Sequence, residues 1–233
     1  LPLAKTIRLM LDSIKDSLGS PVEIEFAVDL GKNNNDLASF YLLQIKPLVG
    51  NQLNYDIDLD EIDKSTAVLF SSLSLGNGII DKIYDVVYVD IHTFNKMKTT
   101  EMSLEIEKIN ENMIKQNRKY ILMGQGRWGS RDRHLGIPVC WAQISNAKVI
   151  VEISLSDFPI DASLGSHFFH NITSMNIGYL SVLDTTQTDF VRWDILNQQE
   201  IVEKTSYLRH VRFEKPLTVY MDGRKKISVI ITK

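Results

Sequence analysis

The sequence predicts a mixed α/β fold made of two parts. Before residue 50, a helical pattern is followed by two short segments with strand-like alternation. After residue 65, strand patterns and helix patterns follow one another along the chain, as in α/β domains. Residues 51–65 are polar and acidic and are expected to form a linker. We therefore expect one domain over residues 1–50 and a second over 66–233.

The first part is expected to contain one helix and one hairpin. Over residues 3–18, apolar side chains recur at helical spacing, with Pro2 near the first turn and Gly19 just beyond the end. Residues 22–29 and 38–46 read as strands, and the segment between them is rich in Gly, Asn and Asp. Two strands joined by turn residues predict a β-hairpin with a long loop.

The second part is expected to carry most of the strands. An amphipathic helix is predicted over residues 100–117, because Met102, Ile106, Ile109 and Met113 share one stripe. A second helix is expected to open at residue 166. Strands are expected over residues 66–75, 79–91, 119–123, 147–155, 178–183, 207–213, 217–221 and 226–231. Asp222-Gly223 lies between the last two and is typical of a tight hairpin turn.

Charge and cysteine content exclude several classes of protein. The 233 residues carry a formal net charge of −3, so no global basic field attracts nucleic acid. No apolar run approaches the length of a membrane span. The single cysteine, Cys140, allows no internal disulfide and fits a reducing compartment, so a cytoplasmic location is expected. A homodimer is compatible with this composition.

The expected hairpin has an acidic face. Glu23 and Glu25 are two residues apart on one strand, so their side chains point the same way. Gln44 and Lys46 have the same relationship on the other strand. Two neighbouring carboxylates opposite an amide and a cation suit Mg²⁺ and a nucleotide phosphate chain. The alternative is the solvated face of an edge hairpin, which is the commoner origin of alternating charges.

The hairpin residues also resemble a known family. The segments PVEIEFAVD and FYLLQIKPL are similar to the final hairpin of the ATP-grasp half of bacterial phosphoenolpyruvate synthase and pyruvate phosphate dikinase. The resemblance implies that Glu23, Glu25 and Gln44 line a site for ATP and Mg²⁺, with Glu23 and Glu25 as metal ligands. Lys46 stands where the family usually has arginine. The N-terminal nucleotide-binding half of that module is missing from this sequence.

The second part resembles the swivelling phosphohistidine domain of the same family. The resemblance is carried by SLGNGIIDKIYDVVYV, AKVIVEIS, LGSHFFHNI, MNIGYLSV and LTVYMDGRKKISVII, which occur in the family's order. It makes residues 95–140 an insertion and implies that His167 is the phosphorylated histidine. A helix N-terminus beside His167, with Ser166 as its cap, would stabilise the phosphoryl group. Phe168 and Phe169 replace two small residues of the family motif.

A glycine-rich and arginine-rich segment has no counterpart of known role. We define residues 124–138 (GQGRWGSRDRHLGIP) as the arginine loop. Arg127, Arg131 and Arg133 lie among its glycines, and guanidinium groups beside bare backbone amides suit a phosphate or carboxylate. The alternative is a loop whose arginines pair with local acids. Its glycine spacing imitates a dinucleotide-binding motif, but the sequence that follows does not read as a helix.

Two functions follow from these patterns. The first is a fragment of an ATP-dependent phosphotransferase, a kinase, in which the histidine passes a phosphoryl group to a small-molecule acceptor such as pyruvate. The fragment alone is then expected to be inactive. The second is a catalytically inactive swivelling-type domain that binds an anionic ligand or a partner protein.

Overall fold

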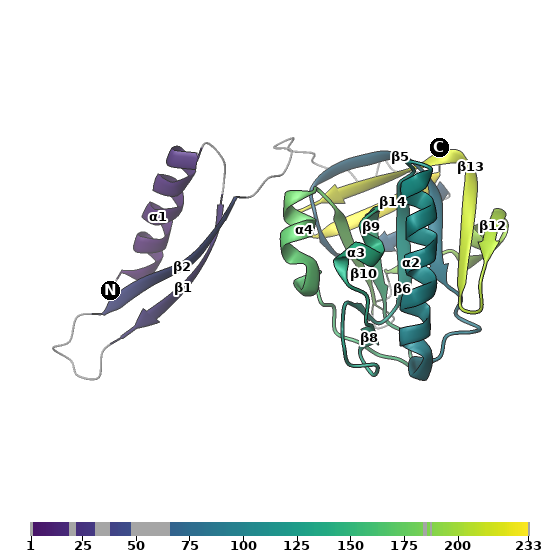
Figure 1. Ribbon diagram of the computed structural model, residues 1–233. Helices are drawn as coiled ribbons and strands as arrows, with labels where there is room; N and C mark the ends of the chain where they lie inside the picture. Colours follow the sequence, from purple (N-terminus) through teal and green to yellow (C-terminus); the bar gives the residue numbers. More distant parts are fainter. Residues whose placement is uncertain are drawn as a thin grey trace. The chain divides into compact units, whose positions relative to one another are not determined.

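The computed structural model describes residues 2–18, 22–30, 38–47, 66–183, 186 and 188–232. The chain divides into two compact units (Figure 1). One unit contains residues 1–50 and is grouped with residues 173–175, and the other contains residues 51–172 and 176–233. The linker expected at 51–65 lies outside the described residues.

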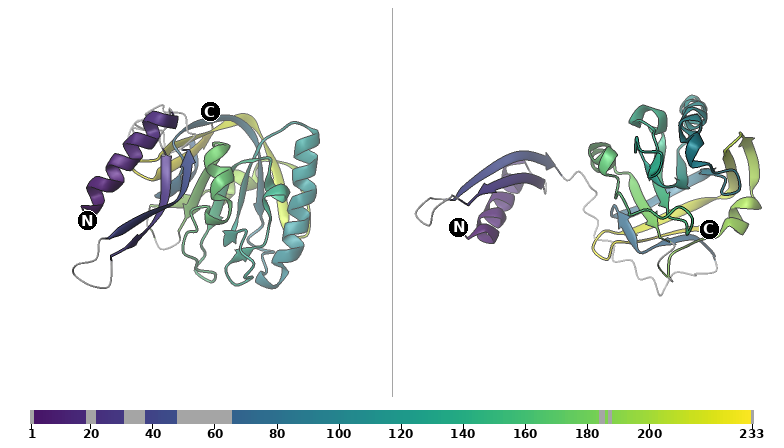
Figure 2. Two further views of the ribbon diagram at one scale, coloured as in Figure 1. Left: turned by 60° about the vertical axis from the view of Figure 1, so that its left-hand side comes forward. Right: turned by 90° about the horizontal axis from the view of Figure 1, so that it is seen from below.

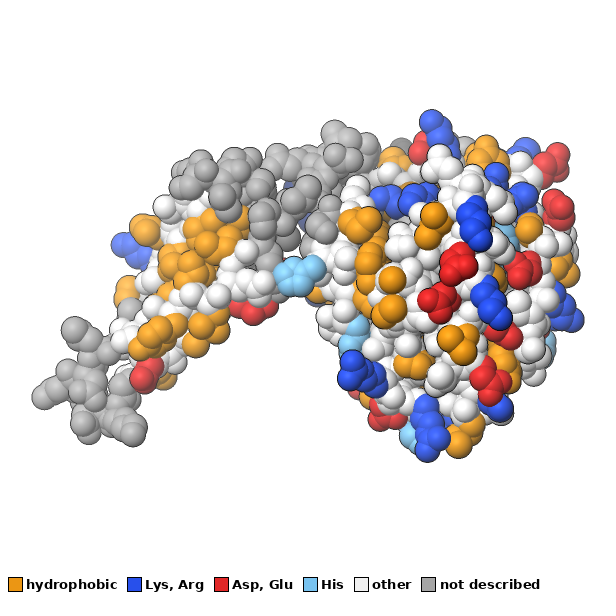
Figure 3. Space-filling view, in the orientation of Figure 1, with side chains coloured by type: hydrophobic (Ala, Val, Ile, Leu, Met, Phe, Trp, Pro, Cys, Tyr) orange, Lys and Arg blue, Asp and Glu red, His pale blue; other side chains and the backbone are white. Residues whose placement is uncertain are grey.

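The N-terminal unit is a helix packed on a hairpin. Helix α1 (Leu3–Leu18) contacts β1 (Val22–Asp29), which pairs antiparallel with β2 (Ser39–Pro47). These bounds lie within one residue of the predicted ones. Large apolar side chains remain exposed on this unit and gather over α1 and the hairpin (Figure 3). They are Leu9, Phe26, Leu30, Tyr41, Leu42, Leu43 and Ile45.

The C-terminal unit is built on one ten-stranded mixed sheet. Its parallel part contains β5 (Gly78–Val89), β6 (Tyr120–Gln125), β9 (Ala147–Ile153) and β10 (Gly178–Val182), in that order. Its antiparallel part contains β3 (Ala67–Ser71), β4 (Leu73–Leu75), β11 (Phe190–Val191), β12 (Glu200–Lys204), β13 (Leu208–Asp222) and β14 (Ile227–Thr232). The residues 95–140, expected as an insertion, contribute the central strand β6.

The sheet curls so that its two ends meet. β3 pairs with β14, whereas β4, separated from β3 only by Ser72, pairs with β10 at the other end of the strand order. Buried serines join the ends: Ser71 Oγ donates to Ser181 O at 2.7 Å, and Ser228 Oγ donates to Ser74 Oγ at 2.7 Å. Short side chains allow the strands to approach closely, and their hydroxyl groups form hydrogen bonds with buried polar groups such as the Ser181 carbonyl.

Helices connect the parallel strands. They are α2 (Thr99–Lys115), preceded by the 3₁₀ turn η2 (Lys96–Lys98); α3 (Trp141–Ile144); and α4 (Phe169–Ser174), preceded by η3 (Ser166–Phe168). Figure 2 shows α2 and α4 on the same face of the sheet. None of the helices in the described part of the chain has the length and apolarity needed to cross a membrane.

The parallel strands separate two hydrophobic cores. Along β5, Val86 and Tyr88 face the antiparallel strands, whereas Val87 and Val89 face the helices. The apolar stripe of α2 belongs to the second core and is fully buried, as its spacing predicts. The unit therefore has three layers: antiparallel strands, parallel strands and helices. The predicted α/β class is confirmed at this level.

Two predicted strand assignments were wrong. The single strand expected at 66–75 is broken at Ser72, because its halves pair with different neighbours. The two strands expected at 207–213 and 217–221 are one long strand, β13. Sequence patterns also missed the shortest elements: α3, α5 (Trp193–Asn197), β7 (Arg127–Trp128), β8 (Gly136–Ile137), β11 and β12.

The final turn differs from the prediction as well. Asp222 pairs with Ile227, so four residues, 223–226, form the hairpin loop instead of a two-residue turn. The carboxylate of Asp222 accepts hydrogen bonds from Arg224 N at 2.9 Å and Lys225 N at 3.0 Å. This side-chain turn stabilises the longer loop.

Candidate functional site

The loops that follow β6 and β9 meet at the carboxyl edge of the parallel strands. Gly126 N, directly after β6, donates to Ile153 O at the end of β9, at 3.0 Å. Further along the loop, a Cβ added at Gly129 would lie 2.9 Å from the Cβ of His167. The arginine loop and the His167 segment therefore lie side by side. Binding residues are often carried by loops that a rigid scaffold positions in this way.

The glycines of the arginine loop are required by its backbone. Gly126 and Gly129 have φ values of +85° and +86°, which L side chains rarely adopt. A Cβ at Gly136 would lie 1.8 Å from Arg127 O, because β7 and β8 pair closely there. The short strand β7 follows β6 where a dinucleotide-binding motif would begin a helix. These glycines therefore allow the loop to fold compactly and do not form a dinucleotide-binding motif.

A buried carboxylate organises this edge. Glu152, near the end of β9, is 1% exposed and accepts hydrogen bonds from three different segments. They come from Trp128 N at 3.2 Å, Ser163 N at 2.9 Å, Ser163 Oγ at 2.5 Å and Tyr179 Oη at 2.7 Å. Burial, followed by the charge of Glu152, raises the pKa of Tyr179 well above its usual value. Tyr179 therefore remains a hydroxyl donor to Glu152.

Sequence analysis did not identify Glu152 as a site residue. The available signal was one acidic residue inside the apolar strand AKVIVEI, where burying an unsatisfied charge is costly. The partners of Glu152 lie on three separate segments, so only the folded chain reveals them.

His167 is exposed at the start of the segment that connects β9 to β10. It lies in η3, which leads into α4, as expected. Its ring makes no hydrogen bond or ion pair with other residues of the described ranges. The expected serine cap is wrong: the cap position is Gly165, with φ +69°, and no side chain caps η3. η3 and α4 are short, so their dipole contributes little at His167.

Phe168 does not cover His167. Its side chain is 5% exposed and belongs to the core between the sheet and the helices. There it packs against Trp141, with ring centroids 6.0 Å apart. Its ring also lies close to Gly129, because a Cβ added at Gly129 would be 2.7 Å from Phe168 Cζ. Phe169 is half-buried. Phe168 thus fixes the His167 segment to the core and leaves the imidazole accessible.

The three arginines of the loop have different environments. Arg127 Nε donates to Asp161 O at 2.8 Å, and Arg127 Nη2 lies 4.0 Å from the Asp161 carboxylate. Arg131 and Arg133 are exposed, and neither forms an ion pair within the described ranges. Arg127 therefore ties the loop to the segment before His167. Arg131 and Arg133 are accessible to an anionic ligand.

The hairpin residues belong to the other unit. Glu23 pairs with Lys46 and Glu25 pairs with Gln44, so Glu23, Glu25 and Gln44 share one face, as predicted. Glu23 is half-buried and Glu25 is exposed. Among the described residues, no group of three or more His, Cys, Asp or Glu side chains is arranged to hold a metal ion. A cation held by Glu23 and Glu25 would need further ligands, such as nucleotide phosphates.

Comparisons with protein-family models, with curated proteins and with solved structures find no match to this chain. The fold and the site therefore define a class by geometry alone. It is a three-layer α/β unit with an accessible histidine beside a glycine-rich and arginine-rich loop.

Proposed function

We propose that this chain is part of an ATP-dependent phosphotransferase similar to phosphoenolpyruvate synthase and pyruvate phosphate dikinase, with His167 as the phosphoryl carrier. The observation that best supports this proposal is the accessible imidazole of His167. The Cβ of His167 lies against Gly129 of the arginine loop, and the ring makes no hydrogen bond within the described ranges. A carrier histidine needs an unobstructed ring nitrogen, which this position offers.

The chemistry requires a neutral imidazole nitrogen of His167 to attack phosphorus in line. A nitrogen–phosphorus bond forms as the phosphorus–oxygen bond to the leaving group breaks. In the second step an acceptor oxygen, such as that of pyruvate enolate, takes the phosphoryl group and the nitrogen–phosphorus bond breaks. The guanidinium groups of Arg131 and Arg133 would neutralise phosphoryl charge in both steps.

The N-terminal hairpin supports the nucleotide half of the proposal. Glu23, Glu25 and Gln44 share one face, and Mg²⁺ typically binds one or two carboxylates together with nucleotide phosphates. This donor set fits Mg²⁺, which would supply charge neutralisation for the phosphates when bound. The large apolar side chains exposed on this unit favour a role as one piece of a larger ATP-grasp domain.

The test uses the natural protein that contains this chain, incubated with ATP labelled at the β- or the γ-phosphate. We expect acid-labile, base-stable label on the wild type and no label on His167→Ala. His170→Ala is the matched control, since His170 is an exposed histidine of α4 and should keep the label. Label that persists in His167→Ala would contradict the proposal. So would an unlabelled wild type that binds ATP.

The second candidate is an anion-binding domain without catalysis. The exposure of Arg131 and Arg133, without ion pairs in the described ranges, favours it. Such a domain would bind pyrophosphate with the same affinity in wild type and His167→Ala and would never acquire label. The labelling experiment therefore distinguishes the two functions.

A further inference from the structure

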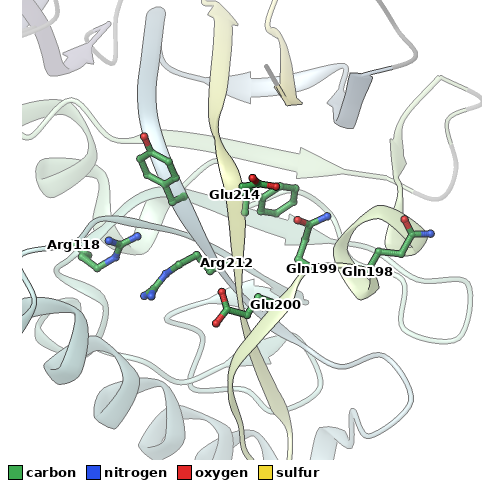
Figure 4. Close-up of a pocket in the computed structure, with 8 residues that line it drawn as sticks. Arg118, Gln198, Gln199, Glu200, Arg212 and Glu214 are labelled. Atoms are coloured by element: carbon green, nitrogen blue, oxygen red, sulfur yellow. The ribbon is translucent and has the colours of Figure 1, made fainter.

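A cavity lies at the opposite end of β6 from His167. It has a volume of about 630 Å³ and is lined by polar residues that include Tyr84, Arg118, Gln199, Glu200, Arg212 and Glu214 (Figure 4). Arg118 lies two residues before β6 begins at Tyr120, whereas the arginine loop starts in the last two residues of β6 and continues beyond the strand. A six-residue strand separates these ends by roughly 17 Å. The cavity is therefore separate from the proposed phosphoryl site.

The cavity lies where the ladder between β5 and β13 is interrupted. Arg212 pairs with Asp85 and Leu217 pairs with Ile83, so residues 213–216 of β13 stand opposite Tyr84 alone. The ladders of β13 with β12 and β14 do not include residues 213–216 either. Bulges of this kind often occur at binding sites because they redirect side chains and free backbone groups.

Two arginines form one side of the cavity. Figure 4 shows Arg118 and Arg212 pointing toward one another. Both are held from behind by Asp85, which is 1% exposed: Arg118 Nη2 lies 2.6 Å and Arg212 Nε lies 2.9 Å from its carboxylate. Their own side chains remain 33% and 30% exposed. The two arginine side chains are thus fixed in place and partly exposed at the cavity.

Both guanidinium groups keep hydrogen-bonding capacity. Nη1 of Arg118 has no acceptor within the described part of the chain. Nη2 of Arg212 has none there either, although this atom is itself buried from solvent. Arg118 also lies over the ring of Tyr84, 5.9 Å from its centroid, which restricts its movement. A carboxylate is the planar acceptor that such a pair of forks recognises.

The remaining wall carries the opposite charge. Glu214 and Gln199 lie across the cavity from the arginines, and Glu200 lies next to Arg212 (Figure 4). The two lining arginines are balanced by two lining glutamates, and Asp85 adds a negative charge behind them. A purely anionic ligand would therefore be repelled by one wall. A ligand with separated charges would be stabilised by both.

From this arrangement we infer that the cavity binds a zwitterionic α-amino acid. The ligand's carboxylate lies between Arg118 and Arg212, and its ammonium group faces Glu214 and Glu200. Gln199, which also lines the cavity, supplies further hydrogen-bonding groups. The volume is in the range of known small-molecule sites and leaves space for the amino-acid side chain.

The test is a binding screen of the purified chain with the proteinogenic L-amino acids as probes, by ligand-observed NMR followed by calorimetry. We expect at least one free amino acid to bind. Its N-acetyl form lacks the ammonium group and its amide form lacks the carboxylate, so both should bind at least about tenfold more weakly. Glu214→Gln and Arg212→Lys should each weaken binding by a similar factor.

Glu203→Gln is the matched control, because Glu203 lies on β12 but does not line the cavity. It should bind as the wild type does. Glu214 is exposed, so its variant reports on binding even if Arg212→Lys impairs folding. The inference is overturned if no amino acid binds, if N-acetylation has no effect, or if Glu203→Gln weakens binding as much as Glu214→Gln.

Discussion

Glu152 holds Ser163 by two hydrogen bonds, one from the backbone nitrogen at 2.9 Å and one from the hydroxyl at 2.5 Å. The hydroxyl oxygen of Ser163 in turn accepts from Gly165 N at 3.2 Å. Gly165 precedes Ser166 and His167. A buried side chain of β9 therefore determines the course of the chain that presents the candidate carrier histidine.

Glu152→Ala should destabilise the C-terminal unit by about 3 kcal/mol, because it leaves several buried donors without an acceptor. Tyr179→Phe removes only one of these hydrogen bonds and should cost about 1 kcal/mol. Urea unfolding followed by circular dichroism measures both free energies. A smaller effect for Glu152→Ala than for Tyr179→Phe would show that Glu152 does not organise this edge.

Asp85 should make stability depend on acid pH. Burial alone would raise the pKa of Asp85, but hydrogen bonds from His210, Arg118 and Arg212 outweigh it and hold the pKa below the ordinary value of 3.8. A lowered folded-state pKa stabilises the protein above the unfolded-state pKa, and this contribution is lost as pH falls through the folded-state value. Wild-type unfolding free energy should therefore decline below about pH 4.

Asp85→Asn should lack this part of the pH dependence. It should also cost about 3 kcal/mol at neutral pH, since two arginines lose their shared counter-charge. Asp81→Asn, an exposed position of the same strand, is the control and should retain the wild-type pH profile. Chemical unfolding at several pH values measures both. If the unfolding free energies of Asp85→Asn and wild type change with pH in parallel, Asp85 is not the source of the acid-pH dependence.

Gly129→Ala should destabilise the site by about 2 kcal/mol. Its φ of +86° disfavours any side chain, and the new Cβ would lie 2.7 Å from Phe168 Cζ. Ser166→Ala should change stability by less than about 0.5 kcal/mol, because no side chain caps η3. Thermal unfolding measures both, and the proton NMR signal of the His167 ring should shift only in Gly129→Ala. Equal effects of Gly129→Ala and Ser166→Ala on stability would show that the close packing of Gly129 against Phe168 does not matter for stability.

Arg131→Gln and Arg133→Gln should each weaken binding of inorganic pyrophosphate about fivefold, since an exposed ion pair contributes about 1 kcal/mol. Raising the salt concentration should weaken binding in the wild type and less so in the variants. Lys108→Gln, an exposed cation of α2, is the control. Calorimetric titration measures the affinities. If Lys108→Gln has the same effect, binding follows net charge and no specific anion site exists at the loop.

Long periodic elements could be predicted from the sequence. α1 and the hairpin strands have the expected bounds within one residue, and the stripe of α2 is buried as expected. Elements such as α3 and β7 contain four and two residues, so they span little more than one period of any pattern. The merging of two expected strands into β13 depends on its neighbours in the sheet.

The sequence by itself determined the α/β class, the shared face of Glu23 and Glu25, and the start of a helical segment at His167. These features depend on residues close together in the chain, where side-chain period and turn chemistry act. The tertiary structure alone decided that His167 lies beside Gly129, that Glu152 joins three segments, and that Arg118 and Arg212 share Asp85. These contacts depend on strand order and register, which bring together residues that are distant in the sequence.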